Sequence, residues 1–163
     1  MSSMRKKPWN RVNLPVYSIS SKNREEQDNM HMITYVTAIS MQPKRIVCGV
    51  YRGTQTLDNL MESREFVLQL LSADQYKLTK ILGKTSGKNQ DKMPYLQKKQ
   101  LVQPWEGFQV LTDALSVMQL RILHQFDGGD HVGFLCDVVQ YKNLQPGEPL
   151  TLDILRAHQL IRI

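Results

Sequence analysis

The side chains that could do chemistry lie in three short segments of this 163-residue chain, and none is a complete catalytic motif. Residues 128–131 read Gly-Gly-Asp-His and set a carboxylate beside an imidazole. Residues 52–56 read Arg-Gly-Thr-Gln-Thr and combine a cation with two hydroxyls. Residues 34–37 read Thr-Tyr-Val-Thr and place an aromatic ring among small hydroxyls.

Several familiar catalytic sites do not occur in the sequence. Residues 83–89, GKTSGKN, resemble a phosphate-binding P-loop, but three residues separate the glycines instead of four, and Asn89 follows Lys88 instead of Ser or Thr. No G-x-S-x-G segment is present. The four histidines and two cysteines do not have zinc-ligand spacing. We therefore expect neither a metal site nor a hydrolase, which leaves chemistry carried by a bound cofactor.

Each of the three segments also has a purely structural interpretation. Residues 34–37 would form an ordinary β-strand. Residues 52–56 suit a phosphate monoester, but the same residues would cap a helix after a surface turn, with Thr56 as the candidate N-cap. The two glycines before Asp130 favour a tight turn, in which Asp130 would satisfy His131.

The elements that would position these segments are mostly strands. β-branched and aromatic residues alternate with polar ones in several short runs. Strands are expected at 14–20, 31–40, 45–51, 66–71, within 108–127 and at 133–142, helices at 56–64 and 73–82, and a polar, mobile loop at 83–100. Six or more strands with few helices predict a mainly β fold, a closed β-barrel with helical excursions.

Composition and charge limit the remaining possibilities. The net charge of +6 comes entirely from residues 1–24, because residues 25–163 hold fifteen groups of each sign. The basic side chains of that segment are Arg5, Lys6, Lys7, Arg11, Lys22 and Arg24. We expect a flexible basic arm at 1–13 and a single domain at 14–163. RNA binding would rest on this charge alone, so no nucleic acid is expected.

The same composition gives the expected compartment. The start of the chain has no apolar run of signal-peptide type, and no run approaches membrane-spanning length. Cys48 and Cys136 stand alone among apolar residues, so we interpret them as buried free thiols in a reducing cytoplasm.

Four segments, in order, resemble the flavin reductase family of FMN-binding split barrels. Residues 32–43, MITYVTAISMQP, are similar to the family's strand ending in S-x-x-P, and residues 56–72, TLDNLMESREFVLQLLS, to its helix and following strand. Residues 86–93, SGKNQDKM, resemble an S-G…D-K-F loop. Residues 129–139, GDHVGFLCDVV, resemble G-D-H-x-x-F-x-G-E-V. Together the resemblance covers residues 14–163.

The resemblance implies a fold, an activity and a set of site residues. It implies a split β-barrel that binds FMN or FAD, accepts hydride from NADH or NADPH, and forms a homodimer. Reduced flavin or electrons would pass to a partner such as a flavin-dependent monooxygenase. The flavin ring would lie against Thr34, Tyr35, Val36, Thr37 and Ser40, and the phosphate against Arg52, Thr54 and Thr56. His131 would position the nicotinamide with support from Asp130.

A different class of function remains an alternative, namely a non-catalytic FMN-binding or electron-transfer module. The departures from the family pattern affect the details of the site. Met32 stands where many members have Thr, Lys44 replaces a second Pro, Arg64 replaces a Gly, and Cys136-Asp137 replaces Gly-Glu. The change at Met32 lies on the strand expected to contact the flavin.

Overall fold

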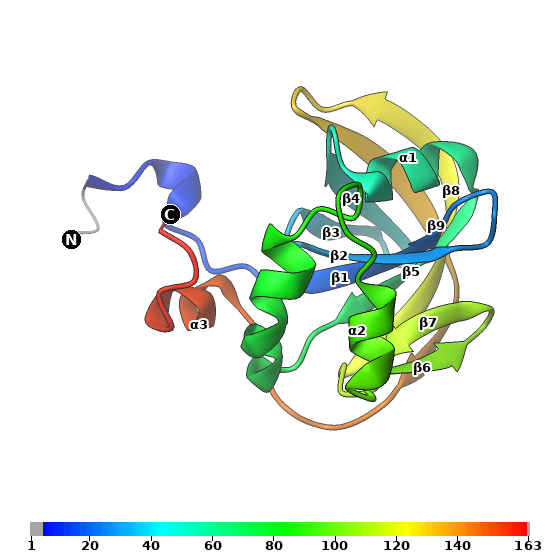
Figure 1. Ribbon diagram of the computed structural model, residues 1–163. Helices are drawn as coiled ribbons and strands as arrows, with labels where there is room; N and C mark the ends of the chain where they lie inside the picture. Colours follow the sequence, from blue (N-terminus) through cyan, green and yellow to red (C-terminus); the bar gives the residue numbers. More distant parts are fainter. Residues whose placement is uncertain (1–4, 163) are drawn as a thin grey trace.

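Seven antiparallel strands form the main sheet of the computed structural model, which describes residues 5–162 (Figure 1). Their order in the sheet is β2-β1-β5-β8-β9-β4-β3, and a separate hairpin pairs β6 with β7. The strands are β1 Tyr17–Lys22, β2 Asp28–Ile33, β3 Val36–Ser40, β4 Arg45–Tyr51, β5 Glu65–Leu70, β6 Val102–Trp105, β7 Phe108–Leu111, β8 Ser116–Asp127 and β9 His131–Asn143. The helical segments are α1 Gln55–Glu62, α2 Met93–Lys98, α3 Leu152–Ala157, the 3₁₀ helices η2 Pro8–Asn10 and η3 Ala73–Leu78, and the π-helix η4 Lys80–Lys84.

The sheet rolls up because its two outermost strands follow each other directly in the chain. β2 and β3 lie at opposite edges of the sheet, and only Thr34 and Tyr35 connect them. The prediction of one continuous strand over residues 31–40 is therefore wrong. The barrel is split, as the family resemblance implies, and not closed as the strand count alone suggested, because in the described part of the chain β2 and β3 do not pair with each other.

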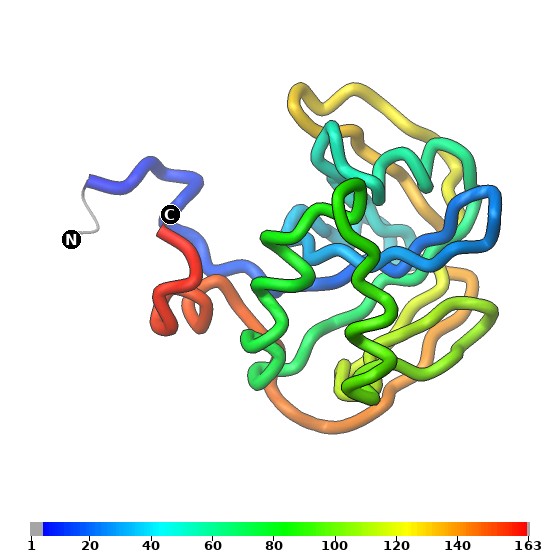
Figure 2. Tube along the Cα trace, in the orientation of Figure 1, coloured from blue at the N-terminus to red at the C-terminus, as the bar shows by residue number. Residues whose placement is uncertain are grey.

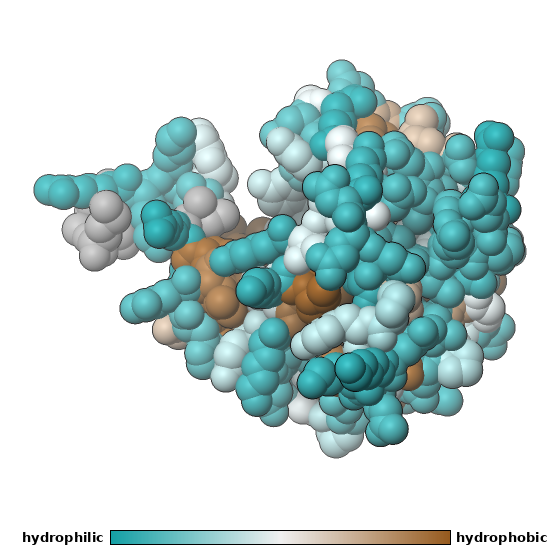
Figure 3. All heavy atoms as spheres, in the orientation of Figure 1, coloured by the Kyte–Doolittle hydropathy of each residue, from teal (hydrophilic) through white to brown (hydrophobic). Residues whose placement is uncertain are grey.

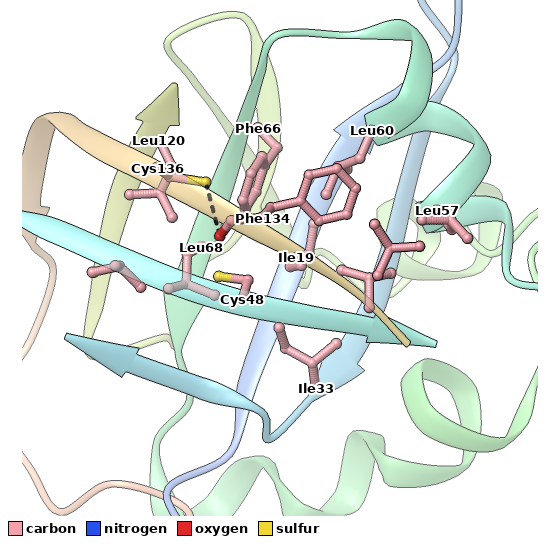
Figure 4. Packing of buried hydrophobic residues seen from close by; sticks show 13 residues of the cluster. Ile19, Ile33, Cys48, Leu57, Leu60, Phe66, Leu68, Leu120, Phe134 and Cys136 are labelled. Carbon is pink, nitrogen blue, oxygen red and sulfur yellow. Dashed lines mark hydrogen bonds between the residues drawn. The ribbon is translucent and has the colours of Figure 1, made fainter. Parts of the chain in front are cut away.

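The interior of the rolled sheet is packed with apolar side chains from nearly every strand. In β4 the buried positions alternate as Ile46, Cys48 and Val50, as expected for a strand with one face inward. Phe134 and Phe66 lie at the centre of the cluster (Figure 4). Cys48 and Cys136 are both free and buried, as predicted, and burial raises the pKa of the Cys136 thiol to about 12.

Helix α1 closes one end of this core and also carries a buried polar contact. Leu57 and Leu60 join the apolar cluster. The Asn59 side chain donates to Ser21 Oγ at 3.0 Å and accepts from Gln55 Nε2 at 2.8 Å. Thr54 is the N-cap, because its Oγ accepts from the Leu57 amide at 3.1 Å. The prediction that Thr56 caps this helix is therefore wrong by two residues.

A helical excursion leaves the barrel between β5 and β6. The helix predicted at 73–82 is two helical segments in succession, the 3₁₀ helix η3 and the π-helix η4, which extends to Lys84. The segment 83–100, predicted as loop throughout, contains α2, which has Pro94 in its first turn. The tube in Figure 2 shows this excursion in green, running from η3 through α2 to the hairpin of β6 and β7.

The N-terminal and C-terminal segments lie beside each other (Figure 2). The Asp153 amide donates to Asn13 Oδ1 at 2.9 Å, and Arg156 Nη2 donates to the Asn10 carbonyl at 3.3 Å. The part of the predicted arm that the structure describes therefore contacts α3, and residues 1–4 of that arm lie outside the described residues. Within residues 5–162 no helix has the length and apolar character needed to cross a membrane.

The buried contact between Asn59 and Ser21 predicts a measurable loss of stability when it is removed. Asn59→Ala leaves a buried hydroxyl without its donor, so the free energy of unfolding should fall by about 1–3 kcal/mol in urea titrations. Met61→Ala changes an exposed side chain of the same helix and serves as the control. A change within about 0.5 kcal/mol for Asn59→Ala would show that the contact does not hold α1 in place.

Candidate functional site

A groove runs along the split of the barrel, between the strand ends and the helical excursion. Its aromatic section has a volume of about 390 Å³ and is lined in part by Thr34, Tyr35, Tyr51 and His131. Its polar section has a volume of about 270 Å³ and is lined in part by Thr54, Gln55, Thr56, Lys84 and Lys92. The two sections share His31, Tyr51, Gly83 and Lys84, so they form one continuous groove.

The wall of the aromatic section depends on a glycine in β4. The Gly49 amide donates to the Tyr35 carbonyl at 2.8 Å. A Cβ at Gly49 would lie 3.2 Å from Tyr35 Cβ, so the absence of a side chain lets the connection between β2 and β3 lie against β4. The C-terminal segment contributes Leu152, Leu155 and Ile161 to the same section. Figure 3 shows apolar surface where this segment meets the body of the protein.

His131 is held in a fixed orientation at the edge of the aromatic section. It is the first residue of β9 and pairs in register with Tyr51 of β4. Its ring centroid lies 4.9 Å from that of Tyr35 and 5.2 Å from that of Tyr51. Asp130 Oδ1 lies 2.6 Å from His131 Nδ1, a contact that fixes the ring and leaves Nε2 for another partner.

The polar section favours an anion. Its lining includes two lysines and, in the described part of the chain, no Asp or Glu. The first turn of α1 faces it, and the leading amides of a helix have no partner within the helix. Thr54 Oγ is already engaged as the cap and donates to the Tyr51 carbonyl at 2.9 Å, whereas Thr56 Oγ accepts from Asn29 Nδ2 at 3.1 Å.

Two residues of this groove, Lys92 and His31, were not among the predicted site residues. Lys92 is only 2% exposed, although a lysine in a polar loop would be expected in solvent, and its Nζ donates to the Met30 carbonyl at 2.9 Å. Burial lowers its pKa to about 8. The nearby His31 has a buried Nδ1 without a hydrogen-bond partner. Its pKa is lowered to about 4, first by burial and then by the charge of Lys92.

The structure brings some of the predicted site residues together and leaves others apart. Thr34, Tyr35 and His131 meet in the aromatic section, and Thr54 and Thr56 lie in the polar section. Val36 turns toward the core, Thr37 is exposed on β3, and Ser40 pairs with Arg45 at the far end of β3. None of these three lines the groove, and neither does Asp130, whose side chain is exposed.

Arg52 also lies outside the groove lining, in a contact between two strand ends. Its Nη2 lies 2.8 Å from Asp127 Oδ1, and its Nε donates to the Gly129 carbonyl at 2.8 Å. The Gly129 amide and Arg52 both stabilise the ionised carboxylate, so the pKa of Asp127 lies below its usual value. Lys92, one of the two lysines that do line the groove, stands in the D-K pair of residues 86–93 that forms part of the family resemblance.

The fold of the chain is similar to that of several solved structures. No curated protein matches the chain. Among solved structures, an NADH:FAD oxidoreductase from Streptomyces globisporus C-1027 superposes with a TM-score of 0.75 at 17% identity, over 86% of this chain and 81% of the other. An FMN-binding protein from Thermus thermophilus gives 0.74 at 21% identity, over 91% and 86%.

A third structure is the flavin reductase of styrene monooxygenase from Pseudomonas putida S12, with a TM-score of 0.73 at 18% identity over 86% of each chain. The chain also matches a longer protein from Sinorhizobium meliloti 1021, of which it spans about half, 48%. These likenesses confirm the mainly β barrel fold predicted from the sequence.

The depressed pKa of His31 can be measured directly. The folded protein keeps His31 neutral down to about pH 4, whereas an unfolded chain takes up the proton near pH 6.5, so this residue removes stability as the pH falls through that window. NMR titration of the His31 ring should give a pKa near 4. In Lys92→Met that value should rise but stay below 6.5, because burial remains. A His31 pKa near 6.5 in the wild type would contradict the buried position of the ring.

The family itself follows from the whole-chain comparison. The sequence profile of the flavin reductase like domain matches residues 9–157, which is most of the chain. This match confirms the resemblance seen in the four sequence segments and the prediction of a flavin reductase-type oxidoreductase. The chain belongs to the flavin reductase like domain family.

Proposed function

We propose that the groove binds a flavin, with the ring system in the aromatic section and the phosphate in the polar section, and that the protein transfers hydride to it from NAD(P)H. The observation that carries the proposal is the continuity of the two sections. An aromatic wall at one end and an acid-free, lysine-containing helix start at the other match the two halves of a flavin phosphate.

For the ring, the proposal centres on Thr34 and Tyr35. Both residues line the aromatic section at the connection between β2 and β3. Among the other residues predicted to contact the ring, Val36, Thr37 and Ser40 lie further along β3, so the support for them is weaker. A bound flavin would supply the hydride-accepting chemistry, and the protein would supply orientation and exclusion of water.

For the phosphate, the proposal centres on the start of α1 and the two lysines opposite it. Thr54 and Thr56 mark the first turn of the helix, and Lys84 and Lys92 complete the lining. Lys92 is the stronger candidate, because its ammonium is buried and, within residues 5–162, donates only to the Met30 carbonyl. Arg52, predicted from the sequence, already contacts Asp127 and the Gly129 carbonyl.

For the second substrate, we propose that His131 positions the nicotinamide. Its ring borders the aromatic section, and Asp130 and the two tyrosines fix its orientation. Hydride transfer depends on alignment of donor and acceptor more than on acid–base help, so an oriented imidazole at the edge of the flavin site suits this task.

The partner enzyme, the oligomeric state and the cellular location are also proposals. The Pseudomonas putida flavin reductase is a component of styrene monooxygenase, which supports a flavin-using partner enzyme for this chain. Exposed apolar side chains on or next to β3 and on the β8–β9 pair support a homodimer, because an uncovered edge strand tends to associate; they are Ile39, Met41, Leu123, Phe126 and Val139. Free thiols and the use of NAD(P)H support a cytoplasmic location.

The position of the phosphate can be tested by comparing FMN with riboflavin, which lacks the phosphate. Lys92→Met should weaken FMN binding by about 10- to 100-fold, the loss expected for one charge-assisted contact, and should change riboflavin binding much less. Fluorescence titration measures both affinities. Arg52→Ala is the matched comparison. A larger selective loss of FMN binding in that variant would show that the phosphate binds at Arg52 and not at Lys92.

The role of His131 can be tested by anaerobic stopped-flow reduction. His131→Ala should retain flavin and reduce it about 10- to 100-fold more slowly with NAD(P)H, because alignment is lost while the cofactor stays bound. Dithionite needs no docking site and should reduce wild type and variant at the same rate. If wild-type protein binds flavin but NAD(P)H does not reduce it, the chain is an electron-transfer module instead.

A further inference from the structure

Residues 83–92 form a strap that makes up one wall of the polar section of the groove and closes its far end. The strap runs from η4 to the start of α2, past the start of α1 (Figure 1). At its middle, a Cβ on Gly87 would collide with Asn29 Oδ1 and would lie 3.2 Å from Gln55 Cβ. The strap backbone is therefore seated directly on β2 and α1, with no room for a side chain between them.

A second polar cavity lies on the far side of this contact. It has a volume of about 210 Å³ and shares Asn29, Gln55 and Gly87 with the polar section of the groove. Gly87 of the strap packs directly on the other two, Asn29 and Gln55, without space for a side chain, and this close contact forms the partition between the two spaces. Asp28 and Asp91 line the far cavity, whereas the polar section has no acidic lining residue in the described chain.

Contacts on both sides of Gly87 hold the strap in place. Lys88 Nζ lies 3.1 Å from Asp58 Oδ2 on α1. Lys92 donates to the Met30 carbonyl of β2 from a buried position. Asn29, beneath Gly87, is itself fixed by its hydrogen bond to Thr56 Oγ. The partition is thus attached to both elements that it crosses.

We propose that this strap selects FMN over FAD, an inference that rests on the proposed flavin site. FAD carries a second phosphate and an adenosine beyond the first phosphate. With the first phosphate at the start of α1, the closed strap blocks the continuation of the groove toward the far cavity. The carboxylates of Asp28 and Asp91 beyond the partition also repel a second phosphate. A flavin with a single phosphate ends before the partition and meets neither obstacle.

Equilibrium binding of FMN and FAD to the full chain tests the proposal. Wild type should bind FMN at least about 10-fold more tightly than FAD. In Gly87→Ala the new Cβ forces the strap away from Asn29, and the ratio of the two dissociation constants should fall by about 10-fold. Lys88→Ala and Asp58→Ala each remove one exposed ion pair, so the ratio should fall by only about 2- to 5-fold.

Glu62→Ala is the matched control. Glu62 lies on the same helix as Asp58, and its ion pair is with Arg24, so the substitution does not touch the strap. It should leave the ratio unchanged. If Gly87→Ala does not fold by circular dichroism, the two ion-pair variants decide the question. Equal affinity of the wild type for FMN and FAD, or equal weakening of both in the strap variants, overturns the proposal. Failure to bind either flavin overturns the proposed function instead.

Discussion

The two-residue connection between β2 and β3 is the constraint on which the site depends. The chain leaves one edge of the sheet at Ile33 and begins the opposite edge at Val36. Such a short link is possible only if the sheet rolls until its edges meet, and the link itself then lies where strand pairing is interrupted. Tyr35 fits there because Gly49 offers no side chain. The split of the barrel and the wall of the groove are therefore one structural feature.

The pairing of β4 with β9 positions the aromatic residues next to this split. Gly49 pairs with Gly133, and Tyr51 pairs with His131. A Cβ on Gly133 would collide with the Phe126 ring, just as one on Gly49 would crowd Tyr35. Two glycines in register thus leave space for two aromatic rings on the sheet surface. His131 is placed beside the groove by strand register and not by a flexible turn, which suits a residue proposed to align a substrate.

Most of the strands could be predicted from the sequence, because runs such as 45–51, with one buried face, and 66–71, buried on both faces, have strong β propensity. The break at Thr34 and Tyr35 could not, since both residues favour strands and neither Gly nor Pro marks the interruption. Helix α2 was missed because its surroundings are polar and it gains its apolar contacts, through Met93 and Leu96, only in the folded protein.

The predicted site shows the same division between local pattern and tertiary structure. The start of α1 and the Asp130–His131 pair are local in sequence, and the groove contains both Thr54 and His131. Whether a cation reaches the groove depends on distant partners. Arg52 is drawn to Asp127 across the sheet, whereas Lys92 is carried inward by the strap and α2. Residue type alone could not distinguish these outcomes.

The burial of Lys92 gives the polar section its chemical character. Removing an ammonium from water is costly unless a counter-charge accompanies it, and the partner present here is a neutral carbonyl. The same charge disfavours protonation of His31, whose buried Nδ1 lacks a partner. Two polar groups thus face the groove at a cost to folding that an apolar pair would not incur. An anion bound at the start of α1, as proposed for the flavin phosphate, would offset that cost by giving the buried ammonium a counter-charge.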